Sequence, residues 1–175
     1  MTQQQYRIER LGRHHDRAAF TCGEDSLDTY LRQRARQDAD RNVAAVFVLG
    51  DPTTDRVAGY YTLSSASVTL DDLPEAMRRA LPRYPLVPVV LLGRLAIDRA
   101  FHGQGLDEVL LYDALQRAFT VGTREIAAMA VIVDALHDRA RGFYEQYGFQ
   151  RFPSNEYRLF LPMTTIAQLL AEGDA

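Results

Sequence analysis

The sequence predicts a mixed α/β fold, and the stretch from Leu91 to Ala118 carries most of that prediction. The apolar run from Leu91 to Ile97 is typical of a strand buried on both faces. From Glu108 onwards, apolar residues recur about every 3.6 positions, as in a helix with one buried side. The sequence H-G-Q-G-L-D lies between the two, and its glycines allow a tight turn. A strand, a Gly-rich turn and a helix in this order indicate an α/β unit.

The N-terminal half of the chain adds strands and one helix. Alternating residues predict a first strand over 6–11, and an apolar stripe at Leu27, Tyr30, Leu31 and Ala35 predicts a helix. Strands over 44–49 and 57–63 flank the turn sequence G-D-P-T-T-D, which predicts a hairpin. Segment 70–88 is less regular, with acidic residues that favour a helix start and arginines that favour its end.

The C-terminal third predicts a strand, a helix, a hairpin and a last helix. The apolar run 126–133 indicates a second buried strand. A helix over 138–147 is closed by Gly148 in a left-handed conformation. Residues 149–152 and 157–161 form the predicted hairpin, and Thr164 or Thr165 caps a helix that runs to Leu170.

Composition predicts one globular domain over residues 1–175. The hydrophobic share of 47% and the charged share of 25% are ordinary for a globular protein. No apolar run approaches the roughly 20 residues of a membrane span, and we expect neither a signal peptide nor membrane association. The single cysteine, Cys22, excludes an intramolecular disulfide and favours a cytoplasmic location. Without a paired histidine in view, Cys22 is interpreted as a core residue rather than a nucleophile.

All 20 basic residues are arginines, so lysine catalysis is excluded. Arginine suits phosphate, but the net charge of -3 argues against a general nucleic-acid coat and limits any contact to a local patch. The densest positive cluster consists of Arg78, Arg79 and Arg83. Two interpretations stay open for it: the arginines match the helix dipole, or they contact phosphate.

The Gly-rich turn itself predicts an anion site. Gly103 and Gly105 let successive backbone N–H groups point into one concavity, and the following helix start adds unpaired donors and partial positive charge. A phosphate group is the expected ligand.

Four separated motifs resemble one family. G-R-L-A-I-D, G-Q-G-L, A-R-G-F-Y-E-Q-Y-G-F and F-T-C-G-E-D-S-L-D-T-Y-L are similar to sequences of the Gcn5-related N-acetyltransferases, and more narrowly of the acetyltransferase toxins of bacterial toxin–antitoxin pairs. The resemblance spans Phe20 to Leu161. It implies a central twisted mixed sheet flanked by helices and acetyl-CoA as the cofactor.

The resemblance also implies roles for individual residues. The end of the first strand, at Leu95, Ala96 and Ile97, is implied to offer backbone groups to the pantetheine and the acetyl carbonyl. The Gly-rich turn is implied to hold the pyrophosphate and comprises His102, Gly103, Gln104, Gly105, Leu106 and Asp107. Asp134 and Ala135, at the end of the next strand, are implied to lie near the thioester, and Tyr144 is implied to act as general acid.

The chemistry of such a site needs few catalytic groups. A free amine attacks a thioester, backbone N–H groups hold the oxyanion, and the leaving thiolate takes a proton. An α-amino group titrates at about 7.7–8.0, so much of it is neutral at cellular pH and a strong general base is unnecessary. Tyr144 is the predicted proton donor, with an aromatic core role as its alternative.

Asp107 departs from the family pattern, which has Gly or Ala at this position. A carboxylate in the first helical turn stabilises the helix dipole, but it lies where the pyrophosphate is expected and repels it. We expect weakened cofactor binding.

Three functions follow from the resemblance. The first is a toxin that acetylates the α-amino group of aminoacyl-tRNA, blocks translation, forms a homodimer and is neutralised by a ribbon-helix-helix antitoxin, with no metal. The second is an acetyltransferase of small-molecule or peptide amines. The third is a catalytically crippled, antitoxin-binding protein, because of Asp107.

Overall fold

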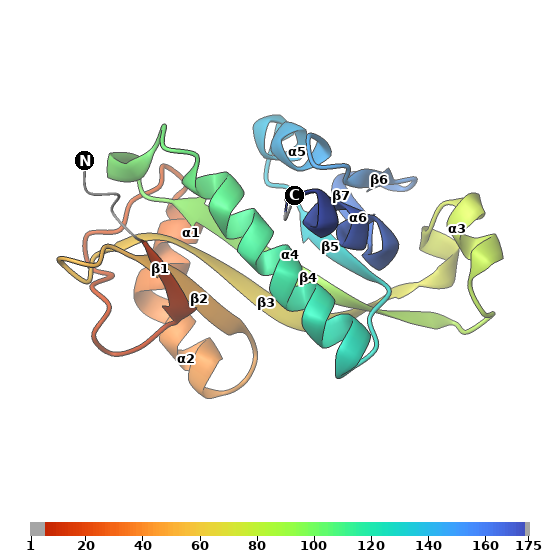
Figure 1. Cartoon of the computed structure of the whole chain (residues 1–175), viewed down its shortest axis with the longest axis horizontal. Helices are drawn as coiled ribbons and strands as arrows, with labels where there is room; N and C mark the ends of the chain where they lie inside the picture. The colour runs from red at the N-terminus through yellow and green to blue at the C-terminus, as the bar shows by residue number, and fades with distance from the viewer. Residues whose placement is uncertain (1–5, 174–175) are drawn as a thin grey trace. The chain divides into compact units, whose positions relative to one another are not determined.

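The structure, a computed structural model, describes residues 6–173 and contains a seven-stranded mixed sheet flanked by helices (Figure 1), which confirms the predicted fold class. The strands are ordered β1-β2-β3-β4-β5-β7-β6. They are β1 (Arg7–Arg10), β2 (Ala45–Gly50), β3 (Val57–Thr69), β4 (Leu86–Ile97), β5 (Ala130–Asp134), β6 (Gln150–Phe152) and β7 (Asn155–Pro162).

Strand β4 changes the direction of the sheet. The pairs β1–β2, β2–β3, β5–β7 and β6–β7 are antiparallel, whereas β4 and β5 are parallel. The β4–β5 register has three pairs and its last pair is Leu92 with Val133. Residues 95–97 therefore follow the last residue of β4 that pairs with β5.

The helices are short except for the one that connects β4 to β5. That helix, α4 (Leu106–Arg124), buries the apolar stripe predicted from its sequence. The others are α1 (Asp25–Thr29), the π-helical turn η1 (Tyr30–Arg34), α2 (Ala35–Asp40), the 3₁₀ turns η2 (Leu70–Asp72) and η3 (Arg99–Phe101), α3 (Glu75–Ala80), α5 (Asp138–Glu145) and α6 (Met163–Gly173). None of the helices within residues 6–173 has the length and apolar character needed to cross a membrane.

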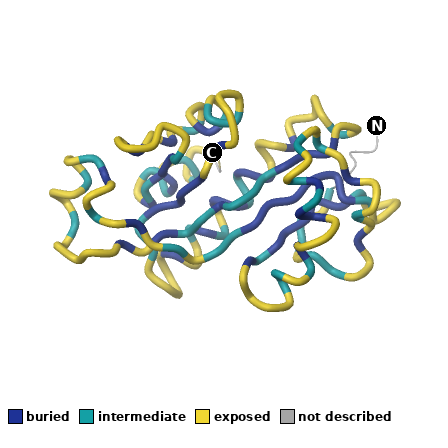
Figure 2. The backbone as a smooth tube through the Cα atoms, turned by 180° about the vertical axis from the view of Figure 1, so that it is seen from behind, coloured by how far each residue is buried: buried dark blue, intermediate teal, exposed yellow. Residues whose placement is uncertain are grey.

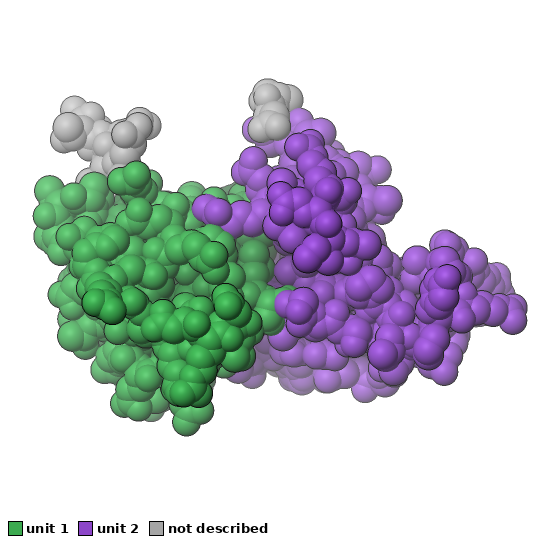
Figure 3. Space-filling model, turned by 90° about the horizontal axis from the view of Figure 1, so that it is seen from below, with its two compact units in different colours: residues 1–64, 93–114 green, residues 65–92, 115–175 purple. Residues whose placement is uncertain are grey.

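The chain divides into two compact units (Figure 3). Unit 1 contains Met1–Ser64 and Gly93–Ala114, and unit 2 contains Ser65–Leu92 and Leu115–Ala175. Each unit takes residues from both halves of the sequence, because β3 and β4 each contribute to both units. A single domain over residues 1–175 stays a prediction.

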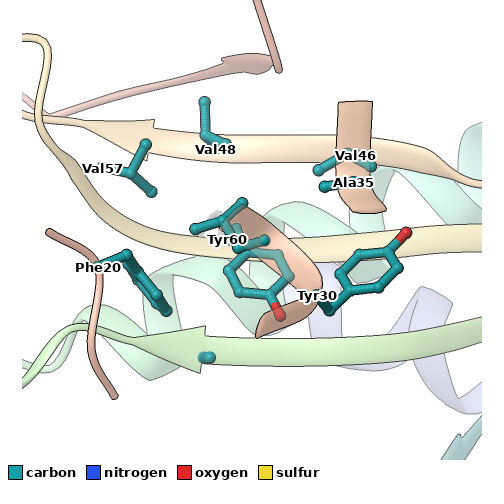
Figure 4. Close-up of a cluster of buried hydrophobic side chains, with 9 residues drawn as sticks. Phe20, Tyr30, Ala35, Val46, Val48, Val57 and Tyr60 are labelled. Carbon is teal, nitrogen blue, oxygen red and sulfur yellow. The ribbon is translucent and has the colours of Figure 1, made fainter. Parts of the chain in front are cut away.

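The core of unit 1 combines aromatic rings with aliphatic side chains (Figure 4). Phe20 contacts Tyr60 edge to face at 5.5 Å between ring centroids, and the Tyr60 hydroxyl donates to the Leu27 carbonyl over 2.7 Å. Gly59 of β3 permits close packing beside it, since a Cβ at this position would lie 2.6 Å from Ile97 Cδ1. The end of β4 therefore packs directly on the backbone of β3.

The core of unit 2 takes residues from β3, β4, β5, β6 and β7. Buried residues follow the strands, and exposed ones are frequent in the loops (Figure 2). Phe152 contacts Phe160 edge to face at 5.4 Å. Met77 and Leu81, from the α3 region, pack against this core. The arginines of α3 consequently remain on the outer side of that segment.

Several boundaries differ from the predictions; among them, β3 runs to Thr69 and α5 ends at Glu145. Strand β4 begins at Leu86 rather than Leu91, and its first residues alternate between exposed and buried, so it is not buried on both faces throughout. Strand β5 begins only at Ala130, because the residues from Ile126, which is 72% exposed, form a turn after α4. Helix α6 begins at Met163, so neither threonine is its N-cap.

Candidate functional site

The Gly-rich loop of unit 1 has the geometry of an anion-binding site. Gly103 and Gly105 have φ values of +81° and +72°, a left-handed conformation that disfavours any side chain. Within residues 6–173, no backbone N–H from Gly103 to Asp107 donates to a protein acceptor. Five successive positions at the start of α4 therefore keep their donors for a ligand.

Two side chains of the loop hold it in place instead of pointing at a ligand. His102 Nε2 lies 2.7 Å from the Ile97 carbonyl oxygen and donates to it, while the Tyr6 hydroxyl donates to Gln104 Oε1 over 3.0 Å. Leu106 is buried. The backbone of these predicted cofactor residues, rather than these three side chains, is therefore the part of the loop left for a phosphate.

Asp107 lies exposed in the first turn of α4. Its Oδ1 accepts the backbone N–H of Glu108 over 2.8 Å. The carboxylate therefore already satisfies one donor of the helix N-terminus and adds negative charge beside the five unused ones.

The end of β4 in unit 1 is packed rather than exposed. Ala96 and Ile97 are buried and Leu95 is partly buried. The guanidinium of Arg94 lies over the Tyr30 ring at 3.5 Å from its centroid. Unit 1 therefore brings together the predicted residues 95–97 and 102–107 at one strand–loop–helix junction.

Unit 2 holds the other predicted contacts, and two of them are engaged by β7. Asp134 Oδ1 accepts from Arg158 Nε over 2.8 Å, and this ion pair raises the pKa of the Arg158 guanidinium. The Ala135 N–H donates to the Tyr157 carbonyl over 2.8 Å. Both residues thus have protein partners at the end of β5.

Tyr144 lies on α5 in an aromatic environment and is only 7% exposed. Its ring contacts Phe143 and Phe149 edge to face at 5.2 and 5.4 Å. Burial raises the pKa of the phenol well above its usual range, so the hydroxyl stays protonated at neutral pH. Within the described residues no hydrogen bond of this hydroxyl is found, and it is not among the fully buried unpaired side-chain atoms. Beside Tyr144 in the helix, Gly142 has no atom within 4 Å of where a Cβ would lie.

The three arginines of the predicted patch differ in their partners. Arg79 Nη2 pairs with Glu75 at 2.6 Å, whereas Arg78 and Arg83 have no ion pair within residues 6–173. The next residue after Arg83, Tyr84, is 68% exposed. The segment thus presents two unpaired cations and one exposed ring.

Two other reactive groups do not form a site. Burial and the neighbouring Asp28 raise the pKa of the Cys22 thiol to about 12, so it is not a nucleophile at neutral pH. Glu9, His14 and His15 cluster closely, but the Gly12 N–H donates to His15 Nδ1 over 2.8 Å. The His15 proton therefore lies on Nε2, which bonds to Glu9 and is not available to a metal.

Comparison with known proteins identifies the family. The family model described as "Acetyltransferase (GNAT) family" matches residues 9–149, which is most of the chain. The chain belongs to the GNAT acetyltransferase family. Its Gly-rich loop, β4 end and α5 tyrosine accordingly lie in the region that the model covers.

Toxins are among the relatives of this GNAT chain. A "tRNA-acetylating toxin" of Mycobacterium tuberculosis (strain ATCC 25618 / H37Rv) is 40% identical over 157 residues, 90% of this chain and 92% of the relative. A structure of AtaT complexed with acetyl-methionyl-tRNAfMet has a TM-score of 0.87 and 31% identity, covering 95% of this chain and 99% of that one. A mutant AtaT toxin bound to the C-terminus of the antitoxin AtaR and acetyl-CoA has a TM-score of 0.79 and 28% identity, with 94% and 98% covered.

Sequence reasoning missed Asp98, the fully buried carboxylate directly after β4. Its partners Thr21 and Arg56 lie 77 and 42 positions away along the chain. The only available indication was its place, an acidic residue between an apolar strand and a Gly-rich loop.

Proposed function

We propose that this protein is a toxin that transfers the acetyl group of acetyl-CoA to the α-amino group of aminoacyl-tRNA and so blocks translation. The observation that carries the proposal is the 40% identity to a tRNA-acetylating toxin over 90% of the chain. The strand–loop–helix junction of unit 1 supports it, because its unused N–H groups suit a phosphate.

In this proposal the cofactor is held mainly by backbone. The N–H groups from Gly103 to Asp107 bind the pyrophosphate, and the end of β4, at Leu95 to Ile97, faces the pantetheine and the acetyl carbonyl. The Ile97 carbonyl accepts one hydrogen bond from His102 and can accept a second, so all three residues stay candidates for binding the pantetheine. Asp134 and Ala135, at the end of β5, are proposed as contacts of the thioester, and both keep their β7 partners.

Proton transfer is assigned to Tyr144. Bound acetyl-CoA supplies an activated acetyl group. The phenol is protonated throughout the physiological range and is not bonded elsewhere within the described residues, so it can donate to the departing sulfur. The attacking α-amino group is largely neutral near pH 8, and the proposal therefore needs no general base from the protein.

The tRNA is proposed to contact the outer side of the α3 segment. Arg78 and Arg83 provide unpaired charge for phosphates, and Arg79 contributes less because Glu75 neutralises it. Tyr84 offers an exposed ring on which an unpaired base can stack.

A ribbon-helix-helix antitoxin and a homodimer complete the proposal. The support for an antitoxin is the similarity to AtaT, which is bound to the C-terminus of AtaR in its structure. Co-expression with the protein encoded beside the gene, followed by light scattering, tests both: we expect a stable complex, and a mass of two chains for the free toxin.

The decisive experiment is acetylation of total charged tRNA. The protein is incubated with acetyl-CoA and aminoacyl-tRNA, and mass spectrometry of the aminoacyl ends identifies the product. We expect acetylated aminoacyl ends; acetylation of free amines or peptides without any of tRNA would instead favour a small-molecule or peptide acetyltransferase.

A second candidate function rests on Asp107. Because its carboxylate engages the Glu108 N–H and adds charge at the phosphate site, the chain is alternatively a crippled protein that binds an antitoxin without catalysis. Repeating the tRNA assay with Asp107→Gly separates the two: activity only in the variant favours the crippled protein, and activity in both favours the toxin.

A further inference from the structure

Asp98 is a buried charge placed where the Gly-rich loop begins. It follows the last residue of β4, is 0% exposed and belongs to unit 1 together with the whole loop. A carboxylate taken out of water is strongly unfavourable unless hydrogen bonds and a counter-charge compensate it. Such a group is retained where its partners do something that an apolar residue cannot.

The partners of Asp98 come from three different segments. Oδ2 accepts the Thr21 N–H over 3.0 Å, from the turn that precedes α1. Oδ1 accepts the Ala100 N–H over 2.8 Å and Arg56 Nη2 over 3.2 Å. The carboxylate thus ties the turn η3 to two segments that are distant in sequence.

Backbone contacts reinforce the same junction. The Asp98 N–H donates to the Ala58 carbonyl of β3, and the Arg99 N–H donates to the Thr21 carbonyl, each over 2.8 Å. The Arg56 guanidinium lies 5.4 Å from the centroid of the Phe101 ring, at the end of η3. The chain therefore enters the loop along a single fixed path.

The loop depends on that path. After η3, the ring of His102 turns back to Ile97, and Gly103 and Gly105 follow with positive φ. Within residues 6–173 the five N–H groups of the loop have no protein acceptor, so no hydrogen bond of their own fixes their direction. Their orientation depends on the anchors of the loop, which are the His102 and Gln104 side chains and the path of the chain just before them.

We propose that Asp98 is a positioning residue: through Thr21, Ala100 and Arg56 it holds the loop in the conformation that binds a pyrophosphate, without contacting the ligand itself. The inference rests on the proposed acetyl-CoA site. It predicts a defect confined to the part of the cofactor that carries the pyrophosphate.

The test compares two acetyl donors that differ in this part. Acetyl-CoA carries the pyrophosphate, and acetyl-pantetheine lacks it. In Asp98→Asn, only one of the two carboxylate oxygens stays an acceptor, and the other becomes an NH₂ group that faces an N–H donor. We therefore expect the Kd of acetyl-CoA, measured by calorimetry, and the KM of acetyl-CoA to rise about tenfold. The KM of acetyl-pantetheine and the kcat with either donor should stay unchanged.

A matched control separates positioning from stability. Asp28 is also a buried aspartate of unit 1, 3% exposed, and accepts the Cys22 N–H over 2.8 Å. Asp28→Asn should lower the melting temperature but keep the ratio of the two KM values. Arg56→Gln leaves both backbone donors of Asp98 in place. It should raise the ratio of the acetyl-CoA KM to the acetyl-pantetheine KM by a smaller factor than Asp98→Asn does. It replaces Asp98→Asn in the test if that variant does not fold.

The outcomes are distinct. An unchanged KM ratio in Asp98→Asn, or an equal loss with both donors, overturns the positioning role. If the unmodified protein does not distinguish the two donors at all, the loop does not bind the pyrophosphate, and the proposed cofactor site fails together with this inference.

Discussion

The Gly-rich loop of unit 1 and the Tyr144 helix of unit 2 are built on opposite principles. The loop is polar: its donors are unused, and its base is fixed by a buried carboxylate that accepts hydrogen bonds and by a histidine that donates one. Tyr144 packs against Phe143 and Phe149, so its hydroxyl lies in an aromatic environment. The loop offers unused donors to an anion, whereas the helix holds a phenol whose raised pKa keeps it protonated.

This difference predicts how each region responds to mutation. Changes in the loop should alter cofactor affinity and leave the rate of the chemical step. Changes at Tyr144 should alter the rate and leave the affinity. A single variant that shifts both quantities equally would break the comparison.

The largest effect is expected from Tyr144→Phe. The substitution removes one hydroxyl and keeps the ring among its aromatic neighbours, so the melting temperature should change little. Turnover should fall by about 10²–10⁴, the usual contribution of a general acid. Steady-state kinetics on charged tRNA measures the turnover, and calorimetry with acetyl-CoA measures the cofactor affinity. An unchanged kcat would mean that Tyr144 is a core residue.

Asp107→Gly tests the loop, where we expect a change in cofactor affinity rather than in the rate of the chemical step. Two charges about 4 Å apart repel by about 1 kcal/mol in water and about 4 kcal/mol at an effective dielectric constant of 20, so removing the carboxylate should tighten acetyl-CoA binding by several-fold to about a thousandfold. The apo protein should melt earlier, because a favourable charge and an N–H acceptor leave the start of α4. Asp107→Asn, which keeps the acceptor and removes the charge, is the control. Equal affinity in all three proteins would mean that the pyrophosphate is held elsewhere.

A smaller effect is expected from the arginines of α3. Arg78→Gln with Arg83→Gln should raise the KM for charged tRNA several-fold and reduce the slope of log K against log salt by about one for each phosphate contact. Arg79→Gln is the matched control, because Glu75 already pairs with that arginine. Acetyl-CoA affinity should be unaffected, and a parallel loss of it would indicate misfolding.

The pH dependence should separate enzyme from substrate. Since the pKa of Tyr144 is raised, the phenol does not ionise near neutrality and should give no loss of rate up to about pH 9. The rate should instead rise between about pH 6.5 and 8.5 as the α-amino group of the substrate loses its proton. Tyr144→Phe should lower the whole profile without moving its midpoint, and a shifted midpoint would contradict this assignment.

The smallest effect concerns Cys22. With its pKa raised to about 12, the thiol should react with iodoacetamide far more slowly at pH 8 than a free cysteine, whose pKa is about 8.5. The reaction should accelerate as pH rises towards 12. Its rate in urea-unfolded protein, where the shift is lost, gives the reference.

Local sequence patterns predicted the local parts of the site. The positive φ of Gly103, Gly105 and Gly148 follows from glycine itself, and the buried stripe of α4 follows from its apolar period. The role of Asp98 could not be predicted, because a buried carboxylate is defined by partners that only the folded chain brings near. The early start of β4 was missed for a different reason: its first residues alternate between exposed and buried and include Pro88, which argues against a strand when only the sequence is read.

Gly142, in the middle of α5, is a position where a substitution should stabilise the protein against heat. A methyl group there meets no atom, and glycine inside a helix costs roughly 0.5–1 kcal/mol relative to alanine. Gly142→Ala should therefore raise the melting temperature of the purified protein and lengthen the time for which it stays folded on storage.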